Sequence, residues 1–119
     1  MVTSDFSARI NDVLRYVGIT RNMNAYMILS QALTLIAEDE DRLRAVEKEI
    51  YTPIADKTLR GPRAVQSTVR RASKVAWDFF PDRVQELAGY SLNGRPSAVT
   101  MLELLYNGVA RYDDLSILK

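Results

Sequence analysis

The sequence has no cysteine and no histidine among its 119 residues. Without cysteine there is no disulfide bond, no thiolate nucleophile and no cysteine-ligated metal. Without histidine the chain lacks the most frequent general base and the most frequent metal ligand in proteins. We therefore rank an enzyme last among the function classes, and we expect neither a cofactor nor a metal ion.

Long hydrophobic runs are also absent. No apolar segment approaches the roughly 20 residues that cross a bilayer, and the first residues lack the basic and apolar regions of a secretory signal. Hydrophobic residues make up 47% of the chain and charged residues 26%, which is ordinary for a globular protein. We expect a single domain over residues 1–119, located in the cytoplasm and not associated with a membrane.

Acidic residues are missing from one stretch of the chain. Residues 57–77 hold six basic side chains and no Asp or Glu, whereas the remainder holds ten basic and fifteen acidic ones. The net charge of the whole chain is only +1, but the stretch alone is +6 and the remainder is −5. Such an asymmetry is typical of a surface that binds an anion, and the alternative is a solvated basic helix face.

Apolar residues recur at helical spacing, and no segment alternates as a half-buried strand does. Turn and capping residues divide this pattern into helices predicted over residues 4–17, 22 or 24–38, 41–50, 53–58, 62–79, 82–88 and 98–112. Ser4, Thr52, Gly61 and Ser97 are the predicted N-caps, and Gly18 and Gly89 are the glycines predicted to end helices. These elements predict an all-α fold, a compact bundle of six to seven helices.

An acidic cluster covers residues 38–41. Acidic side chains favour the first turn of a helix, where the backbone dipole is positive, so we assign the cluster to the start of the helix predicted over 41–50. A divalent metal site is the alternative. We reject it because the cluster lacks the spaced ligands and the turn glycine of a calcium loop.

Residues 53–79 have the layout of a helix-turn-helix: a short helix, the turn Leu59–Gly61, and a longer helix that begins at Pro62. In such a motif the second helix lies in the major groove of DNA and its side chains contact base edges. On the longer helix one stripe repeats at intervals of four and three residues, and we expect it to be buried. The stripe consists of Val65, Val69, Ala72, Ala76 and Phe79.

The polar face opposite this stripe carries the candidate DNA contacts. Arginine can donate two hydrogen bonds to guanine, and glutamine can both donate to and accept from adenine. The predicted base contacts are Arg63, Gln66, Ser67 and Arg70. The predicted phosphate contacts are Lys57, Arg60, Arg71 and Lys74. We expect Trp77, on the side of this face, to pack on a neighbouring helix.

These residues resemble a known family. The stretches Ile50–Lys57 (IYTPIADK) and Val65–Trp77 (VQSTVRRASKVAW) are similar to the C-terminal effector domain of the master sporulation response regulator of endospore-forming bacteria, the stage-zero sporulation protein A family. Further agreement lies at Gly18, at Gly89 with Tyr90, and at Pro96. The resemblance extends from about Ala8 to Ala110.

The resemblance implies a six-helix effector domain that binds short double-stranded DNA boxes and regulates transcription. It also implies tandem homodimers on repeated sites, contact with RNA polymerase, and a bacterial protein associated with the nucleoid. Family members are controlled by a phosphorylated receiver domain on the N-terminal side. A chain of this length has no room for one, so we expect an excised effector domain or a free-standing relative.

The predicted recognition helix departs from the family pattern at four positions. Where the family has Arg, Glu, Arg and His, this chain has Ala64, Gln66, Ser67 and Arg71. Because these are largely the positions that read DNA, we expect the chain to bind a different box. The alternative function is a helical protein-interaction module whose basic face binds an acidic partner.

Overall fold

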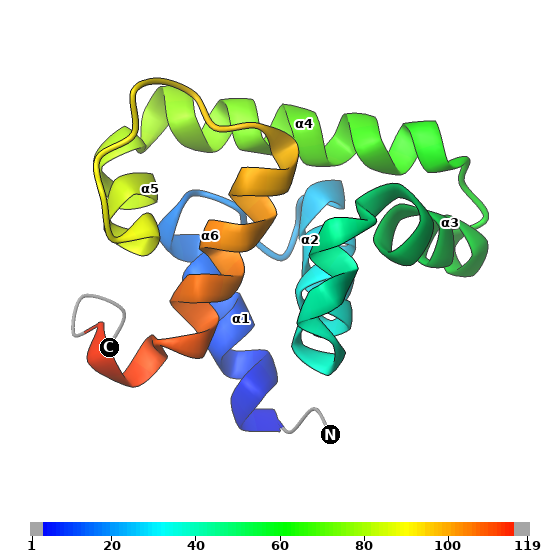
Figure 1. Ribbon diagram of the computed structural model, residues 1–119, viewed down its shortest axis with the longest axis horizontal. Helices are drawn as coiled ribbons and strands as arrows, with labels where there is room; N and C mark the ends of the chain where they lie inside the picture. The colour runs from blue at the N-terminus through cyan, green and yellow to red at the C-terminus, as the bar shows by residue number, and fades with distance from the viewer. Residues whose placement is uncertain (1–3, 116–119) are drawn as a thin grey trace.

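The computed structural model of the protein describes residues 4–115. Within that range it contains six α-helices and no strand (Figure 1). The helices are α1 (Ser4–Tyr16), α2 (Asn24–Glu38), α3 (Thr52–Thr58), α4 (Pro62–Phe79), α5 (Pro81–Ala88) and α6 (Ala98–Ala110). The 3-10 turn η1 (Glu40–Arg44) and the π turn η2 (Glu47–Tyr51) lie between α2 and α3, and the 3-10 turn η3 (Tyr112–Asp114) follows α6. The predicted all-α bundle is confirmed.

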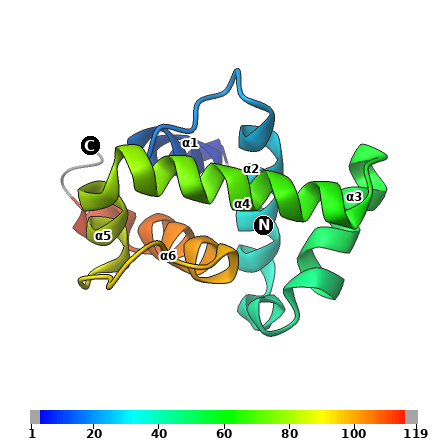
Figure 2. The same ribbon diagram turned by 90° about the horizontal axis from the view of Figure 1, so that it is seen from above.

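The longest helix, α4, lies along one side of the bundle. Figure 1 shows α3 and α5 at its two ends and α1, α2 and α6 beneath it. Seen from above, α1 lies on one side of α4 and α6 lies on the other, α2 runs beneath it, and no element of the described chain crosses over it (Figure 2). One long face of α4 is therefore left open.

The hydrophobic core lies beneath α4 and draws on every α-helix. The side chains of Val65, Val69 and Ala76 are fully buried and fix the inner face of α4. Gly108 lets α6 approach its neighbours closely, because a Cβ atom there would lie 2.8 Å from Cδ2 of Leu87. None of the helices in the described range is long and apolar enough to span a membrane.

The predicted buried stripe of α4 is correct at four positions and wrong at Phe79, whose side chain is 73% exposed. Phe79 is the last residue of the helix. The buried face instead includes Thr68 and Ser73. Their hydroxyls donate to the carbonyl oxygens of Ala64 (3.0 Å) and Val69 (2.8 Å), which satisfies them without a partner outside the helix.

The segment before α4 also differs from the prediction. A helix over 41–50 and a separate helix capped by Thr52 were expected, but η2 runs directly into α3. Thr52 has helical angles (φ −64°, ψ −47°), and its hydroxyl donates to the carbonyl of Glu47 (3.0 Å) instead of capping. Pro53 has no N–H to donate, and its ring would clash with the carbonyl of Glu49 in a regular α-helix, so the chain widens to a π turn there.

The other predicted helix ends agree with the structure within about two residues. Gly18 and Gly89 have φ angles of +86° and +84°, as expected of glycines after a helix. The Ser97 hydroxyl oxygen accepts the N–H of Thr100 (3.1 Å) and caps α6. Ser4 is the first residue of α1 and not the residue before it, and the carboxylate of Asp39 caps η1 by accepting the N–H of Asp41 (3.0 Å).

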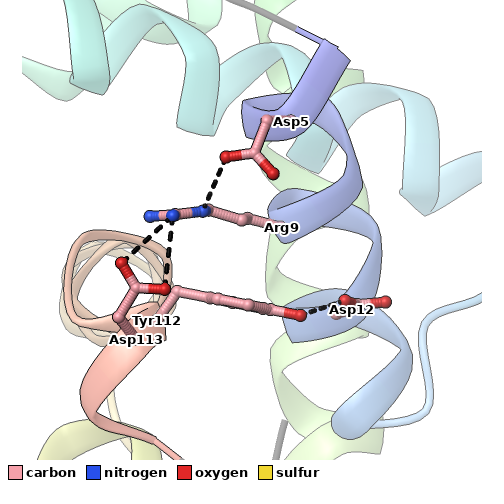
Figure 3. A network of polar contacts seen from close by, with 5 residues as sticks. All are labelled: Asp5, Arg9, Asp12, Tyr112 and Asp113. Atoms are coloured by element: carbon pink, nitrogen blue, oxygen red, sulfur yellow. Dashed lines mark hydrogen bonds and ion pairs between the residues drawn. The ribbon is translucent and has the colours of Figure 1, made fainter. Parts of the chain in front are cut away.

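A polar network ties α1 to η3 near the end of the described chain (Figure 3). Arg9 forms ion pairs with Asp5 (Nε to Oδ2, 3.3 Å) and with Asp113 (Nη2 to Oδ2, 3.2 Å). Its guanidinium lies 5.1 Å from the centre of the Tyr112 ring, and the Tyr112 hydroxyl donates to the carboxylate of Asp12. This network lies at the ends of the chain and takes no part in the basic surface described next.

Candidate nucleic-acid interface

The turn between α3 and α4 is three residues long, Leu59 to Gly61. Leu59 has left-handed angles (φ 58°, ψ 29°), and the N–H of Arg60 donates to the carbonyl of Ala55 (3.2 Å) to close α3. Gly61 is extended, and its carbonyl accepts the N–H of Val65 (3.2 Å) at the start of α4. The buried side chains of α3 pack beneath this corner, so the turn and the start of α4 at Pro62 are as predicted.

The candidate contact residues lie at the surface. Arg63 and Arg70 are exposed on α4, whereas Gln66 and Ser67 are half-buried. The four predicted phosphate contacts, Lys57, Arg60, Arg71 and Lys74, are all exposed. Trp77 is partly buried and packs against the core, as expected. No predicted site residue is enclosed by the fold.

Five of the six basic side chains on α3, the turn and α4 have no ionic partner in the described part of the chain. On other elements Arg9, Arg15, Arg42 and Arg44 each lie within 4.0 Å of a carboxylate oxygen. Among residues 4–115, no ion pair is made by Lys57, Arg60, Arg63, Arg70 or Arg71. Lys74 is the exception, because its Nζ lies 2.6 Å from Oδ2 of Asp78 one turn further along α4.

Two grooves run along the flanks of α4. The α2 groove, of about 220 Å³, lies between α4 and the start of α2 and includes Arg60 and Arg71. The α6 groove, of about 480 Å³, lies between α4, η2 and the start of α6 and includes Gln66 and Arg70. Gln66 and Arg71 therefore lie on opposite flanks of the helix, as its periodicity predicted.

Two residues of the α6 groove had no predicted role. Tyr51 belongs to η2 and is 4% exposed, and Arg95 lies in the loop before α6 and is exposed. No local spacing connects them with α4, because the three segments meet only in the folded chain. A turn followed by the N-cap Ser97 was the nearest signal, since it predicts a helix start with unsatisfied N–H groups next to Arg95.

The open face of α4 and its unpaired cations define an all-helical domain with a surface suited to a polyanion. The chain belongs to the family described as "Sporulation initiation factor Spo0A C terminal", whose sequence pattern matches residues 10–109. This family is the DNA-binding domain of a sporulation transcription factor and is not an enzyme family. The match covers most of the stretch over which the resemblance was found, and it confirms that resemblance.

Proposed function

We propose that the chain binds double-stranded DNA sequence-specifically and regulates transcription, with α3 and α4 as a helix-turn-helix and α4 in the major groove. The observation that carries the proposal is the set of five exposed cations without ion pairs on α3, the turn and α4. Cations that already hold a carboxylate would have to give it up to bind a phosphate. These five need no such exchange.

The base contacts in this proposal come from the open face of α4. Arg63 and Arg70 are exposed, two turns apart, and each has the paired donors that match O6 and N7 of guanine. Gln66 lies on the flank towards the α6 groove, where its amide can meet the edge of an adenine. Ser67 is half-buried between them and is short, so it suits a base or a phosphate that comes close to the helix.

The phosphate contacts in this proposal come from Lys57 on α3, Arg60 in the turn, and Arg71 and Lys74 on α4. Arg60 and Arg71 share the α2 groove, so a single backbone segment passing along that flank would meet both. Lys74 has to exchange the carboxylate of Asp78 for a phosphate oxygen. We therefore expect it to contribute least to duplex affinity among the four phosphate contacts. The α2 side of α4 thus positions the duplex, and the open face reads it.

Selection of bound duplexes from a random pool, at about 0.15 M salt, tests the proposal directly. We expect one enriched motif, an altered base preference at one position for Gln66→Ala, and about a tenfold or greater loss of affinity for Arg63→Ala or Arg70→Ala. Arg44→Ala is the matched control, because it removes the same charge from η1. If no motif is enriched, and an acidic protein is retained instead of duplex, the proposal is wrong and the interaction-module alternative stands.

The family resemblance extends the proposal to assembly on DNA. We propose that two copies bind repeated boxes in tandem, that the bound domain contacts RNA polymerase, and that the protein resides on the nucleoid. Footprinting on duplexes with one box and with two boxes tests the first point. Two boxes should be filled at a lower protein concentration than one, and equal affinity on both duplexes would exclude cooperative assembly.

A further inference from the structure

The α6 groove contains a second group of donors that the proposed base and phosphate contacts do not use. Its walls come from η2, from one flank of α4, and from the start of α6 with the loop before it. Gln66 and Arg70 lie on its α4 wall and also border the open face of that helix. A strand of DNA that leaves the open face on this side therefore passes directly over the groove.

Tyr51 supplies the first donor. Its side chain is 4% exposed and lines the groove, and its hydroxyl forms no hydrogen bond with any residue of the described chain. Burial raises the pKa of the Tyr51 phenol, and the nearby charge of Arg70 lowers it only in part. The hydroxyl is therefore protonated at neutral pH. The hydroxyl oxygen is not among the fully enclosed polar atoms, so it is accessible from the groove and can donate to an acceptor there.

The start of α6 supplies two further donors. Ser97 satisfies the N–H of Thr100 through its side chain (3.1 Å) and the N–H of Met101 through its carbonyl (2.8 Å). The N–H groups of Ala98 and Val99, the first two residues of this 13-residue helix, have no acceptor within the helix. Both residues line the groove, where the positive end of the helix dipole favours an anion.

Arg95 supplies a positive charge. It is exposed, lines the groove, and forms no ion pair within residues 4–115. Glu47, on η2, is the acidic residue of the groove, and it lies within 4.0 Å of neither Arg70 nor Arg95. Two arginines against one glutamate leave the groove positive.

We propose that the α6 groove holds one backbone phosphate of the DNA, bound by the Tyr51 hydroxyl, the Arg95 guanidinium and the N–H groups of Ala98 and Val99. This inference rests on the proposed function, since the phosphate belongs to the duplex whose major groove α4 enters. It gives the α6 flank of α4 the positioning role that Arg60 and Arg71 have on the α2 flank. A phosphate on each flank fixes how deeply and at what angle α4 lies in the groove.

The test measures duplex affinity across a salt series for Arg95→Gln and Tyr51→Phe, with Arg44→Gln as the matched control. Arg95→Gln should lose about tenfold in affinity at the lowest salt. The difference in affinity between the native chain and this variant should then narrow about threefold between roughly 50 and 200 mM salt, as loss of one phosphate contact requires. Tyr51→Phe keeps the buried ring and should lose roughly threefold in affinity with an unchanged salt slope. Neither variant should change the motif that is selected.

Amide NMR shifts identify the source of the phosphate. Duplex DNA should shift the amide signals of Ala98 and Val99 in the native chain, and at the same duplex concentration it should shift them less in Arg95→Gln. Millimolar inorganic phosphate should shift them weakly and be displaced by duplex. If the native chain selects a motif while both variants match Arg44→Gln, this inference fails and the proposed function stands. If the native chain binds no duplex, this inference and the proposed function both fail. Saturation by inorganic phosphate that duplex does not displace would also overturn the inference.

Discussion

The ring of Phe80 lies so close to Gly18 that a Cβ atom on the glycine would be 2.6 Å from Cε2 of the ring. Gly18 follows α1, and Phe80 lies between α4 and α5. Arg83 stacks 5.0 Å from the centre of the same ring and donates to the carbonyl of Tyr16 (3.0 Å). The end of α1 is thus held against the α4–α5 corner, which fixes the far end of the proposed recognition helix.

Gly18→Ala should lower the free energy of unfolding by roughly 2–4 kcal/mol. The side chain would be strained by the φ angle of +86° and would also meet the Phe80 ring. Urea denaturation measures the change. Gly94→Ala is the control, because a Cβ there meets nothing within 4 Å and no positive φ opposes it. Equal stability of the two variants would show that the contact with Phe80 is not tight.

Leu59→Gly should raise the free energy of unfolding by about 1 kcal/mol. Leu59 adopts a left-handed conformation (φ 58°) that disfavours a branched side chain, and that side chain is 94% exposed, so little packing is lost. Thermal unfolding monitored by circular dichroism gives the change. A lower melting temperature would mean that the exposed leucine makes a stabilising contact which outweighs its backbone strain.

Tyr112→Phe should cost about 1 kcal/mol of stability at neutral pH, since it removes the hydroxyl that donates to Asp12. This hydrogen bond, more than burial, raises the pKa of Tyr112 above its ordinary value of about 10. Above that pH the unfolded phenol ionises before the folded one, so stability present at lower pH is lost as pH rises through the folded pKa. Chemical denaturation from about pH 8 to 11 should show a shallower decline for the variant. Tyr90→Phe, on a 55% exposed ring, is the control, and parallel declines would contradict the assignment.

Asp78→Asn should increase duplex affinity a few-fold and steepen its salt dependence by up to one phosphate contact. The substitution releases Lys74, whose Nζ now lies 2.6 Å from the Asp78 carboxylate, and removes a negative charge from the end of the proposed DNA-binding face. Fluorescence anisotropy with a labelled duplex is a suitable measurement. Glu103→Gln on α6 removes an exposed carboxylate elsewhere and should have a smaller effect. Unchanged affinity in Asp78→Asn would remove Lys74 from the set of phosphate contacts.

The features that were predicted from the sequence depend on local chemistry. Gly18, Gly89 and Ser97 end or begin helices because a positive φ or a side-chain cap acts within one turn. The buried stripe of α4 followed from its 3.6-residue period. The predicted burial of Phe79 was wrong, because the period gives the direction of a side chain and not whether a neighbouring element covers it at the end of the helix.

The features that were missed depend on distant parts of the chain. Tyr51 and Arg95 are more than forty residues apart in sequence and share a groove only because η2 and the start of α6 pack on the same flank of α4. One ionic partner was equally hidden, since Arg9 meets Asp113 near the other end of the described chain. The ion pair of Lys74 with Asp78, by contrast, joins residues four apart on one helix, a spacing that the sequence itself shows.

The division of α4 into a buried stripe and an open face constrains how its specificity could evolve. Substitutions at Arg63, Gln66 or Arg70 leave Val65, Val69 and Ala76 untouched, so a new target sequence can be acquired with little loss of stability. A single inserted residue would instead rotate everything after it by about 100° and turn core positions towards the DNA. Relatives with different target sites should therefore differ by point changes along this helix and keep its length.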